Sequence, residues 1–283
     1  MSRELPSFDL VVATVDRTDD LGNLLDSLEA QQYDRLRVIV VDQNEDDRVA
    51  PFLEGRALRL ERIRAGRGLS HARNTALAGL EADIVAFPDD DCVYPEGTLE
   101  RVGRRFAADQ ELSGITGRAG DEHGRSSPSW RPDAALLTDD NLWNRAISFT
   151  IFVRREVVER VGPFDERLGL GSSETWASGE EIDYLIRAVR AGARIAYDPS
   201  LVVRHDVRDD DASVGARDGA SVGYLLRKHD YRARVVVRML VRPLGGALLA
   251  LGKLDVDLAR RRFATFRGRV RGYRGAKRAK ISA

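Results

Sequence analysis

The stretch Ile84-Val85-Ala86-Phe87-Pro88-Asp89-Asp90-Asp91 joins a short run of apolar residues directly to three consecutive aspartates. The apolar run has the length and composition of a buried strand. Three carboxylates this close raise one another's pKa and repel, so they require a compensating cation. Their oxygen atoms suit Mg²⁺ or Mn²⁺, which also bind phosphate oxygens. The stretch therefore predicts a site for a metal ion and a diphosphate, and the alternative is a solvated acidic turn.

Strand and helix patterns alternate on both sides of this stretch. Buried strands are expected at 8–14, 37–42, 58–61 and 83–87, and helices at 19–30, 46–54, 70–82 and 95–108. This order is typical of an α/β fold with a mostly parallel central sheet and helices on both faces. Ligands of such sheets bind at the carboxyl ends of the strands, which is where the three aspartates would lie.

The second half of the chain has a less regular pattern. Strands are expected at 112–117, 147–153, 194–197 and 201–204, and helices at 155–161 and 178–191. Beyond Asp206 the chain becomes helical and rich in arginine. We therefore expect a catalytic domain over residues 1–206, divided at about residue 110, and a helical, basic C-terminal extension over 207–283.

Composition excludes several classes of protein. The single cysteine, Cys92, excludes a disulfide framework and a cysteine-based zinc cluster, and it fits a reducing compartment. We expect no secretory signal and no membrane span, because no run of eighteen apolar residues is present. The net charge is zero, yet residues 258–283 contain ten basic residues and no acidic one. An acidic body with a basic tail predicts an anionic surface as a partner.

Polar residues follow the first two expected strands at the point where each ends. Thr14 ends the first strand and Asp16 follows it, and Asp42 ends the second strand and Asn44 follows it. Such side chains can bind a base or a ribose at the carboxyl edge of the sheet. The alternative is ordinary turn chemistry, because Asp and Asn are common in turns.

A glycine-flanked loop enters the helix expected at 70–82. It reads GRGLSHARN over residues 66–74 and offers Arg67 and Arg73 to a phosphate near the helix N-terminus. No lysine follows the glycines, so the loop is not a Walker phosphate loop.

The helix expected at 178–191 opens with the acidic segment GEEID at residues 179–183. Its apolar stripe is expected to leave Glu180, Glu181 and Asp183 off the buried face, and Ser178 matches a capping box with Glu181. A carboxylate at this helix start can act as a general base if it borders a metal site.

His205 follows the last expected strand of the catalytic domain. At that strand end it can complete a metal shell together with Asp91. The alternative is a structural histidine.

Taken in order, these segments resemble the inverting glycosyltransferases of family 2, which have the GT-A fold. The resemblance rests on Thr14 after the first strand and then on VVDQN, GLSHARN, FPDDDC, GEEID and RHD, and it covers residues 8–206. It implies a metal-dependent enzyme that uses Mn²⁺ or Mg²⁺ and a nucleotide-diphosphate sugar. The enzyme would transfer a hexosyl or deoxyhexosyl group to a hydroxyl of a glycan or lipid-linked acceptor, in bacterial cell-surface glycan or glycolipid assembly.

The resemblance also implies which part of the chain binds the donor. Residues 1–110 would form the nucleotide-sugar half and residues 111–206 the acceptor half. The residues expected around the nucleotide are Thr14, Asp16, Asp42, Asn44, Arg67, Arg73, Asp89 and Asp90. The residues expected around the metal ion are Asp91, which holds it, with Asp89, and with His205 as a further ligand or a diphosphate contact.

The catalytic base and the acceptor site are implied in the same way. The pair Glu180-Glu181 matches the family's Glu-Asp motif, and Glu181 is favoured as the base, with Glu180 as the alternative. The acceptor residues are expected to be Gly171, Ser172, Trp176 and Asp183, with Trp176 stacked on a sugar. The sequence departs from the family in DQNE at residues 42–45, where Asp-Asp-Gly-Ser is common, and in Glu181, where Asp is commoner.

Two other functions fit parts of the pattern. A phosphotransferase with an aspartate nucleophile would use Asp89 and Asp91, but it would also recruit a later lysine, and the first lysine is Lys228. A non-catalytic sugar- or lipid-binding homologue would lack the metal or base positions, which are all present.

The C-terminal extension has two interpretations. Residues 235–254 are rich in apolar residues, although Arg238, Arg242, Pro243 and two glycines interrupt them, and they precede the basic tail. They predict an interfacial anchor at an anionic leaflet or a helical cap on the catalytic domain. We expect a cytoplasmic protein, peripheral on the inner face of the plasma membrane. No nucleic-acid partner is expected, because aromatic residues are few in the tail and no reading motif is present.

Overall fold

The computed structural model describes residues 4–121, 123–127, 129–205 and 212–276. The chain divides into two compact units, one of residues 1–164 with 181–207 and one of residues 165–180 with 208–283. The domain boundary expected at residue 206 lies outside the described residues, as do the basic residues Lys277, Arg278 and Lys280.

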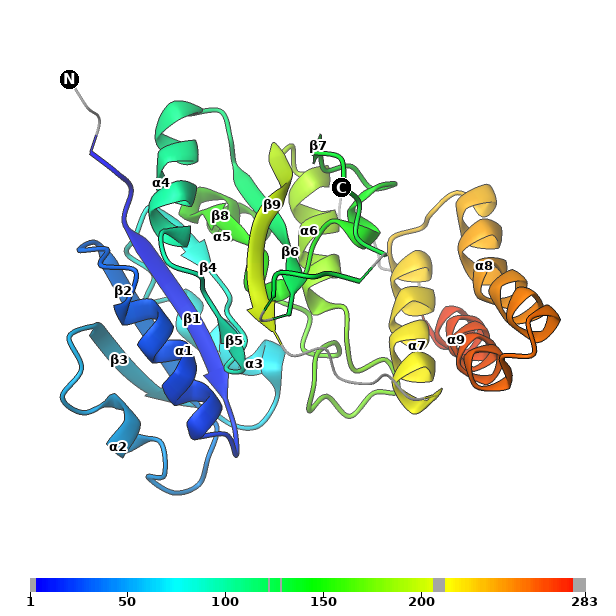
Figure 1. The fold of residues 1–283 in the computed structure, drawn as a ribbon, viewed down its shortest axis with the longest axis horizontal. Helices are drawn as coiled ribbons and strands as arrows, with labels where there is room; N and C mark the ends of the chain where they lie inside the picture. Colours follow the sequence, from blue (N-terminus) through cyan, green and yellow to red (C-terminus); the bar gives the residue numbers. More distant parts are fainter. Residues whose placement is uncertain (1–3, 122, 128, 206–211, 277–283) are drawn as a thin grey trace. The chain divides into compact units, whose positions relative to one another are not determined.

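The first unit is an α/β fold around a nine-stranded sheet (Figure 1). Its strands are β1 (Phe8–Thr14), β2 (Leu36–Asp42), β3 (Arg59–Arg64), β4 (Ile84–Ala86), β5 (Cys92–Val93), β6 (Gly114–Gly120), β7 (Ala135–Leu136), β8 (Phe152–Arg154) and β9 (Ile195–His205). Its helices are α1 (Asp19–Glu29), α2 (Ala50–Leu53), α3 (Leu69–Leu77), α4 (Thr98–Ala108), α5 (Arg155–Val161) and α6 (Glu180–Arg190). Two 3-10 turns, η1 (Leu142–Asn144) and η2 (Ser148–Thr150), precede β8.

The strand order β3-β2-β1-β4-β8-β6-β9-β5 determines where the strand ends meet, with β7 beside β9. Strands β3, β2, β1 and β4 are parallel, whereas β8 is antiparallel to both β4 and β6, so the sheet is mixed beyond β4. The carboxyl ends of β1, β2 and β4 therefore open at one edge. Strand β5 pairs antiparallel with β9 and places Cys92 opposite His205.

The central strands are buried on both faces, which explains their continuous apolar sequence. Because side chains alternate along a strand, Phe8, Leu10 and Val12 of β1 share one face and join the core formed with α1 and α4. The opposite face of β1 and β2 is covered by α3. Helices therefore cover both faces of the parallel part of the sheet.

The second half of the first unit differs from expectation in three places. The strand expected at 147–153 is η2 followed by β8, and the strands expected at 194–197 and 201–204 form one continuous strand, β9. Helix α6 begins at Glu180 and not at residue 178, and the Ser178 hydroxyl donates to Asp218 at 2.9 Å. The capping box expected between Ser178 and Glu181 stays a prediction.

The second unit contains α7 (Ala212–Lys228), α8 (Ala233–Gly252) and α9 (Val256–Gly275) together with residues 165–180. That segment is held by an ion pair between Asp165 and Lys228 at 2.8 Å. Its Trp176 ring also stacks on Tyr224 with the ring centroids 4.7 Å apart. Residues 165–180, which belong to the expected acceptor half, thus pack with the C-terminal helices.

Helix α8 contains a proline in its interior, and α9 compensates for it. Pro243 has no N–H to donate to the carbonyl of Met239, four residues earlier. The guanidinium of Arg269 on α9 donates to that carbonyl oxygen instead. By length and composition α8 is the one described helix that could cross a membrane, and about a third of it is buried.

Candidate active site

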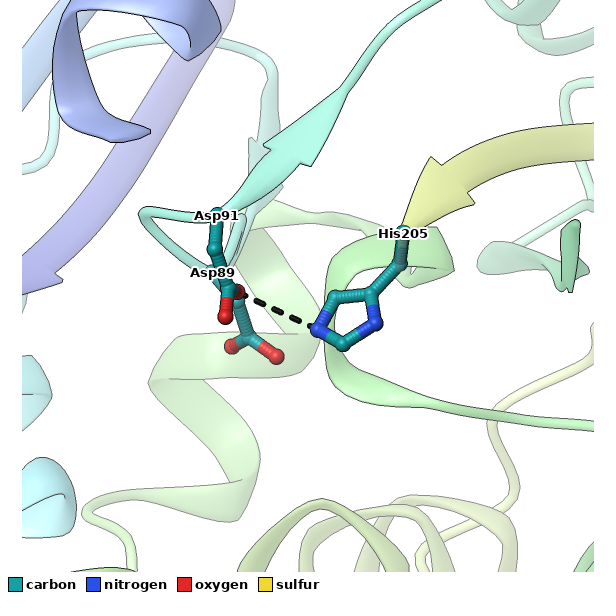
Figure 2. Close-up of side chains that lie close together, drawn as sticks. All are labelled: Asp89, Asp91 and His205. Carbon is teal, nitrogen blue, oxygen red and sulfur yellow. Dashed lines mark ion pairs between the residues drawn. The ribbon is translucent and has the colours of Figure 1, made fainter. Parts of the chain in front are cut away.

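The three aspartates form the turn between β4 and β5, at the carboxyl edge of the parallel strands. Figure 2 shows Asp89 and Asp91 in this turn and His205 arriving from the end of β9. Ala13 of β1 pairs with Asp89 through an isolated bridge, which joins the turn to the sheet. The structure therefore brings the expected metal residues together from two distant segments.

Asp89 is held by a buried guanidinium and a hydroxyl. Arg73 of α3 donates to its Oδ1 at 2.9 Å, and the Ser148 hydroxyl lies 3.0 Å from both carboxylate oxygens. The Arg73 side chain is fully buried and lies over the rings of Phe87 and Phe164, 6.0 and 5.6 Å from their centroids. The ion pair and the two rings fix the orientation of Asp89.

Asp90 points into the protein. The Thr14 hydroxyl donates to its Oδ2 at 2.8 Å, and Arg17 donates to its Oδ1 at 2.8 Å. Burial raises the pKa of this carboxyl to about 6, against the lowering effect of the Thr14 hydrogen bond and the Arg17 charge. Asp90 thus ties the end of β1 to the acidic turn.

Asp91 lies between a guanidinium and an imidazole. Its Oδ2 accepts from Arg17 at 2.5 Å, and its Oδ1 is 3.1 Å from Nε2 of His205. The His205 ring stacks on Phe149 with the centroids 4.9 Å apart, which fixes the imidazole plane.

The donor set fits a divalent metal ion. One ligand atom each from Asp89, Asp91 and His205 lies within 4.8 Å of the others. Two carboxylates and an imidazole are suitable ligands for Mn²⁺, and carboxylate oxygens suit Mg²⁺. Beside them is a hollow of about 210 Å³, lined by Asp91, His205 and Arg204 with residues of α1 and β5. The residues present can therefore hold the ion that the sequence predicts.

The expected nucleotide residues at the ends of β1 and β2 also lie together. Asp42 is fully buried, and its carboxylate accepts from the backbone and side chain of Asn44 and from Arg62. Burial raises the pKa of Asp42, but these hydrogen bonds outweigh it and hold the pKa below its ordinary value. Asn44 Oδ1 in turn accepts from the backbone N–H of Asp16 at 2.8 Å. Asp42 thus orients Asn44, which fixes the loop after β1.

The glycine loop before α3 closes the same edge of the sheet. The Gly68 N–H donates to Oε1 of Gln43 at 2.8 Å, and Arg67 pairs with Asp16 at 3.0 Å. The side chains of both residues in this ion pair are more than half exposed, so they lie at the surface of this edge of the sheet. Arg73, expected near a phosphate, is instead buried against Asp89 and acts on the site through that carboxylate.

The acidic start of α6 differs from expectation. Asp183 is fully buried and accepts from Arg187 at 3.0 Å, and Glu180 is 5 % exposed. The prediction that Glu180 and Asp183 lie off the buried face of the helix is therefore wrong. Glu181, which was predicted to lie there with them, is half-buried. Helix α6 buries polar as well as apolar residues. The positions of its apolar residues alone therefore did not predict its whole buried face.

The remaining expected acceptor residues lie in the second unit. Gly171 has φ +84°, Ser172 follows it, and Trp176 has one ring face covered by Tyr224. Because Tyr224 covers one face of the indole, a sugar could stack only on the other face.

Two residues of the acidic site were not predicted from the sequence. Arg17 contacts Asp90 and Asp91, and Ser148 contacts Asp89. Arg17 lies three residues after Thr14, in the loop that was expected to bind the nucleotide. Its positive charge next to the expected acidic site could therefore have identified it. Ser148 comes from η2, where a strand was expected, and nothing in the sequence indicated it.

A larger open hollow of about 870 Å³ lies elsewhere in the first unit. It is lined by residues of α4, β7 and the start of β9, including Arg101, Arg105 and Tyr197. None of the three aspartates lines it, so it is separate from the candidate metal site.

Comparison with known sequences gives a consistent result. The sequence model described as "Glycosyl transferase family 2" matches residues 9–162, more than half of the chain. A pre-mycofactocin glycosyltransferase of Mycobacterium tuberculosis is 30 % identical over 261 residues, which is 85 % of this chain and 51 % of the relative. Glycosyltransferase AglE of Haloferax volcanii is 24 % identical over 248 residues, 81 % of this chain and 72 % of the relative. The chain thus spans about half the length of the mycobacterial relative.

Solved structures share the fold. A mannosyltransferase of Pyrobaculum calidifontis in complex with GDP-Man and Mn²⁺ superposes with a TM-score of 0.69 at 18 % identity, covering 95 % of this chain and 87 % of that one. TarS of S. aureus, residues 1–349 in complex with UDP-GlcNAc, gives a TM-score of 0.58 at 17 % identity, covering 90 % and 89 %. At these identities the likeness shows the GT-A fold, as expected from the sequence.

Proposed function

This chain belongs to glycosyltransferase family 2, and on that premise we propose that it transfers a sugar from a nucleotide-diphosphate sugar to an acceptor hydroxyl with inversion at the anomeric carbon. The observation that carries the proposal is the convergence of Asp89, Asp91 and His205 at the carboxyl edge of the parallel strands. Polar residues from the ends of β1 and β2 lie at the same edge, next to where a nucleotide would bind.

The donor would be held by metal and protein together. Asp91 and His205 would hold Mn²⁺ or Mg²⁺, with Asp89 beside them. The bound ion supplies positive charge that stabilises the departing diphosphate. Of the expected nucleotide residues, Asp16 and Arg67 are exposed at the edge of the sheet, whereas Asn44, Asp42 and Thr14 are buried and support them. Arg73 and Asp90 hold the acidic turn in place.

The transfer itself needs a base for the acceptor. Glu181, at the start of α6, would take the proton of the attacking hydroxyl while the new carbon–oxygen bond forms and the bond to the diphosphate breaks. The proton ends on the carboxylate, and the bond's electron pair leaves with the diphosphate. Glu181 is the more exposed of the acidic pair, which favours it over the buried Glu180.

The sugar and acceptor are the finer part of the proposal. Solved structures of the same fold include complexes with GDP-Man and with UDP-GlcNAc, which supports a hexosyl donor; a deoxyhexosyl donor is the alternative. We propose a cell-surface glycan or a lipid-linked acceptor in a bacterium. Ser172 and Trp176 have buried polar atoms without a hydrogen-bond partner within the described part of the chain, and sugar hydroxyls can supply such partners.

We also propose that the protein acts at the inner face of the plasma membrane as a peripheral protein. Most exposed large apolar side chains among the described residues lie on α8, α9 and the turn between them: Val237, Val241, Leu248, Leu249, Leu251, Leu254, Val256 and Phe263. Residues 233–275 also contain eleven basic residues and two acidic ones. An apolar surface flanked by arginines suits the interface of an anionic bilayer.

The function is tested by donor hydrolysis and by the configuration of the transferred sugar. We expect the protein to release nucleotide slowly from its donor with Mn²⁺ alone, and NMR should show inversion at the anomeric carbon after transfer. Glu181→Gln should lower the transfer rate by about 10²–10⁴-fold, because general-base catalysis contributes that much.

Glu180→Gln is the matched control, because it makes the same change one residue away. A larger loss in Glu180→Gln would assign the base to Glu180. Retention of configuration would contradict the proposed displacement. Absence of both hydrolysis and transfer would favour the non-catalytic homologue, and release of inorganic phosphate from a phosphomonoester would favour the phosphotransferase.

A further inference from the structure

A cation from the loop after β1 contacts two carboxylates of the acidic turn. Arg17 lies between β1 and α1, and its NH1 group donates to Asp90 Oδ1 at 2.8 Å and to Asp91 Oδ2 at 2.5 Å. The arginine side chain is 29 % exposed, compared with 8 % and 13 % for the two carboxylates. Arg17 is therefore the solvent-facing partner in this cluster.

Asp91 is shared between this guanidinium and the metal site. Its other oxygen lies 3.1 Å from His205, and Asp89 is the third residue of the ligand group. A divalent ion held by Asp91 would lie close to the positive charge of Arg17. Because like charges at such distances repel, Arg17 disfavours binding of the ion alone.

The second guanidinium of the site cannot move in the same way. Arg73 is fully buried, pairs with Asp89 and lies over two aromatic rings. Arg17 lies in the loop between β1 and α1, and 29 % of its side chain is exposed. Of the two cations, Arg17 is the one that can exchange partners.

The charge balance favours such an exchange when ion and diphosphate arrive together. Three carboxylates against two guanidiniums leave one negative charge in the turn. A divalent ion alone converts this into an excess of positive charge, whereas the diphosphate of a nucleotide-sugar restores the negative sign. A guanidinium is also well suited to bind phosphate oxygens, often through two hydrogen bonds.

Resting on the function proposed above, we propose that Arg17 couples metal binding to donor binding. In the free protein it holds Asp90 and Asp91. When the ion and the diphosphate bind together, it releases Asp91 to the ion and donates to the diphosphate. By thermodynamic linkage the ion and the diphosphate then strengthen each other's binding by the same factor.

The test is to measure Mn²⁺ affinity by calorimetry and by the EPR signal of free Mn²⁺, using the full chain with and without UDP, GDP or dTDP. Arg17→Gln should bind Mn²⁺ alone about three- to tenfold more tightly, because a repelling charge is removed. The same variant should bind the diphosphate in the presence of Mn²⁺ about tenfold or more weakly. General damage to the site would weaken the binding of both Mn²⁺ and the diphosphate. Tighter binding of Mn²⁺ together with weaker binding of the diphosphate therefore identifies the coupling role of Arg17.

Two further variants sharpen the test. Arg17→Lys keeps the charge but not the two-pronged donor, so Mn²⁺ alone should bind as in the unaltered protein while the diphosphate binds more weakly. Arg104→Gln removes an equal charge from the exposed face of α4 and should change neither affinity. If Arg17→Gln binds Mn²⁺ alone no more tightly than the unaltered protein, the coupling role is wrong. If the unaltered protein binds none of the three diphosphates with Mn²⁺, the proposed function itself is wrong.

Discussion

At the scale of single residues, the acidic turn shows how a protein keeps three adjacent aspartates in one conformation. Every carboxylate of the turn has partners, and Arg17 is shared by two of them. Arg73 and Ser148 contact Asp89, Thr14 and Arg17 contact Asp90, and Arg17 and His205 contact Asp91. Burying unpaired carboxylates would be very costly. The neighbouring cations and donors are therefore as necessary to the site as the aspartates.

A buried ion pair elsewhere in the sheet provides a residue-scale prediction. Arg37 of β2 donates to both oxygens of Asp9 on β1 at 2.8 and 2.7 Å, and Asp9 also accepts from the backbone N–H groups of Glu81 and Ala82. Asp9→Asn removes the buried counter-charge of Arg37 and leaves it only the exposed carboxylates of Glu61 at 3.2 Å and Glu81 at 3.4 Å. We therefore expect a loss of about 3 kcal/mol in the free energy of unfolding, the lower end for a broken buried ion pair. Urea unfolding of the two proteins at pH 7 measures the difference.

The same pair predicts how this difference changes with pH. Burial raises the pKa of Asp9, but the hydrogen bonds and charge of Arg37 and the two backbone N–H groups outweigh it, so the pKa lies below its ordinary value. The stabilisation is then fully present above the unfolded pKa of about 3.9 and is lost as the pH falls through the lower folded pKa. The gap between unaltered protein and Asp9→Asn should be constant from pH 8 to 5 and shrink below about pH 4. A gap that widens in acid would contradict the assignment.

The residues of the site were predicted to different extents. The aspartates and His205 could be found because strand ends and chemistry-bearing residues coincide in the sequence. Arg73 was predicted to be a site residue, but its burial was not predicted. The sequence alone does not distinguish an arginine that contacts phosphate from one that pairs with Asp89. Ser148 could not be found, since its position depends on how η2 folds back onto the turn after β4.

At the scale of secondary-structure elements, the parallel strands were the most predictable part. Strands β1 and β2 are buried on both faces and therefore read as uninterrupted apolar runs. Helix α6 was predicted in position but not in its buried face, because Asp183 is buried through its pairing with Arg187. The pairing of β5 with β9, which brings His205 to Asp91, depends on long-range register that no local pattern contains.

The pairing of α7 with α9 yields an element-scale prediction. The two helices approach through Gly219 and Gly223 on α7 and Gly268 and Gly272 on α9, where an added Cβ would overlap a backbone carbonyl of the partner helix. Gly223→Ala would place its Cβ against the carbonyl of Arg269 and force the helices apart. We expect a loss of about 1–3 kcal/mol or more, as for other overpacked sites.

Gly245→Ala on α8 is the matched control, because nothing lies within 4 Å of an added Cβ there. Alanine favours a helix over glycine by about 1 kcal/mol, so this variant should be neutral or slightly stabilising. The midpoints of thermal unfolding, followed by helical circular dichroism, compare the two. Equal midpoints would show that the glycine contacts between α7 and α9 do not limit stability.

At the scale of the whole molecule, the chain consists of an α/β unit with the candidate metal site and a helical unit with the apolar surface. The fold class and the helical, basic C-terminal region followed from the sequence, because the first depends on alternating strand and helix patterns and the second on composition. That residues 165–180 pack with α7 did not follow, since contacts such as Trp176 with Tyr224 join segments far apart in the chain.

The membrane proposal predicts a salt-dependent affinity for anionic vesicles. Leu249→Glu with Leu254→Glu replaces two exposed apolar side chains, 72 % and 88 % exposed, by charges that anionic lipid repels. Flotation with vesicles of phosphatidylglycerol and phosphatidylcholine should show binding by the unaltered protein that falls as salt rises, and little by this variant. Leu136→Glu, on the α/β unit, is the matched control and should bind as the unaltered protein does. Equal binding by all three proteins, or none by the unaltered one, would contradict the proposal.

The most direct measurement for the central claim is a binding screen of the purified protein against UDP, GDP, dTDP and CMP, each with and without Mn²⁺. We predict that one nucleoside diphosphate binds tightly only with Mn²⁺, and that Asp91→Ala abolishes this metal-dependent binding while the protein remains folded. Binding of no nucleotide, or binding that is equally tight without Mn²⁺ and in Asp91→Ala, would contradict a metal-dependent donor site at the acidic turn.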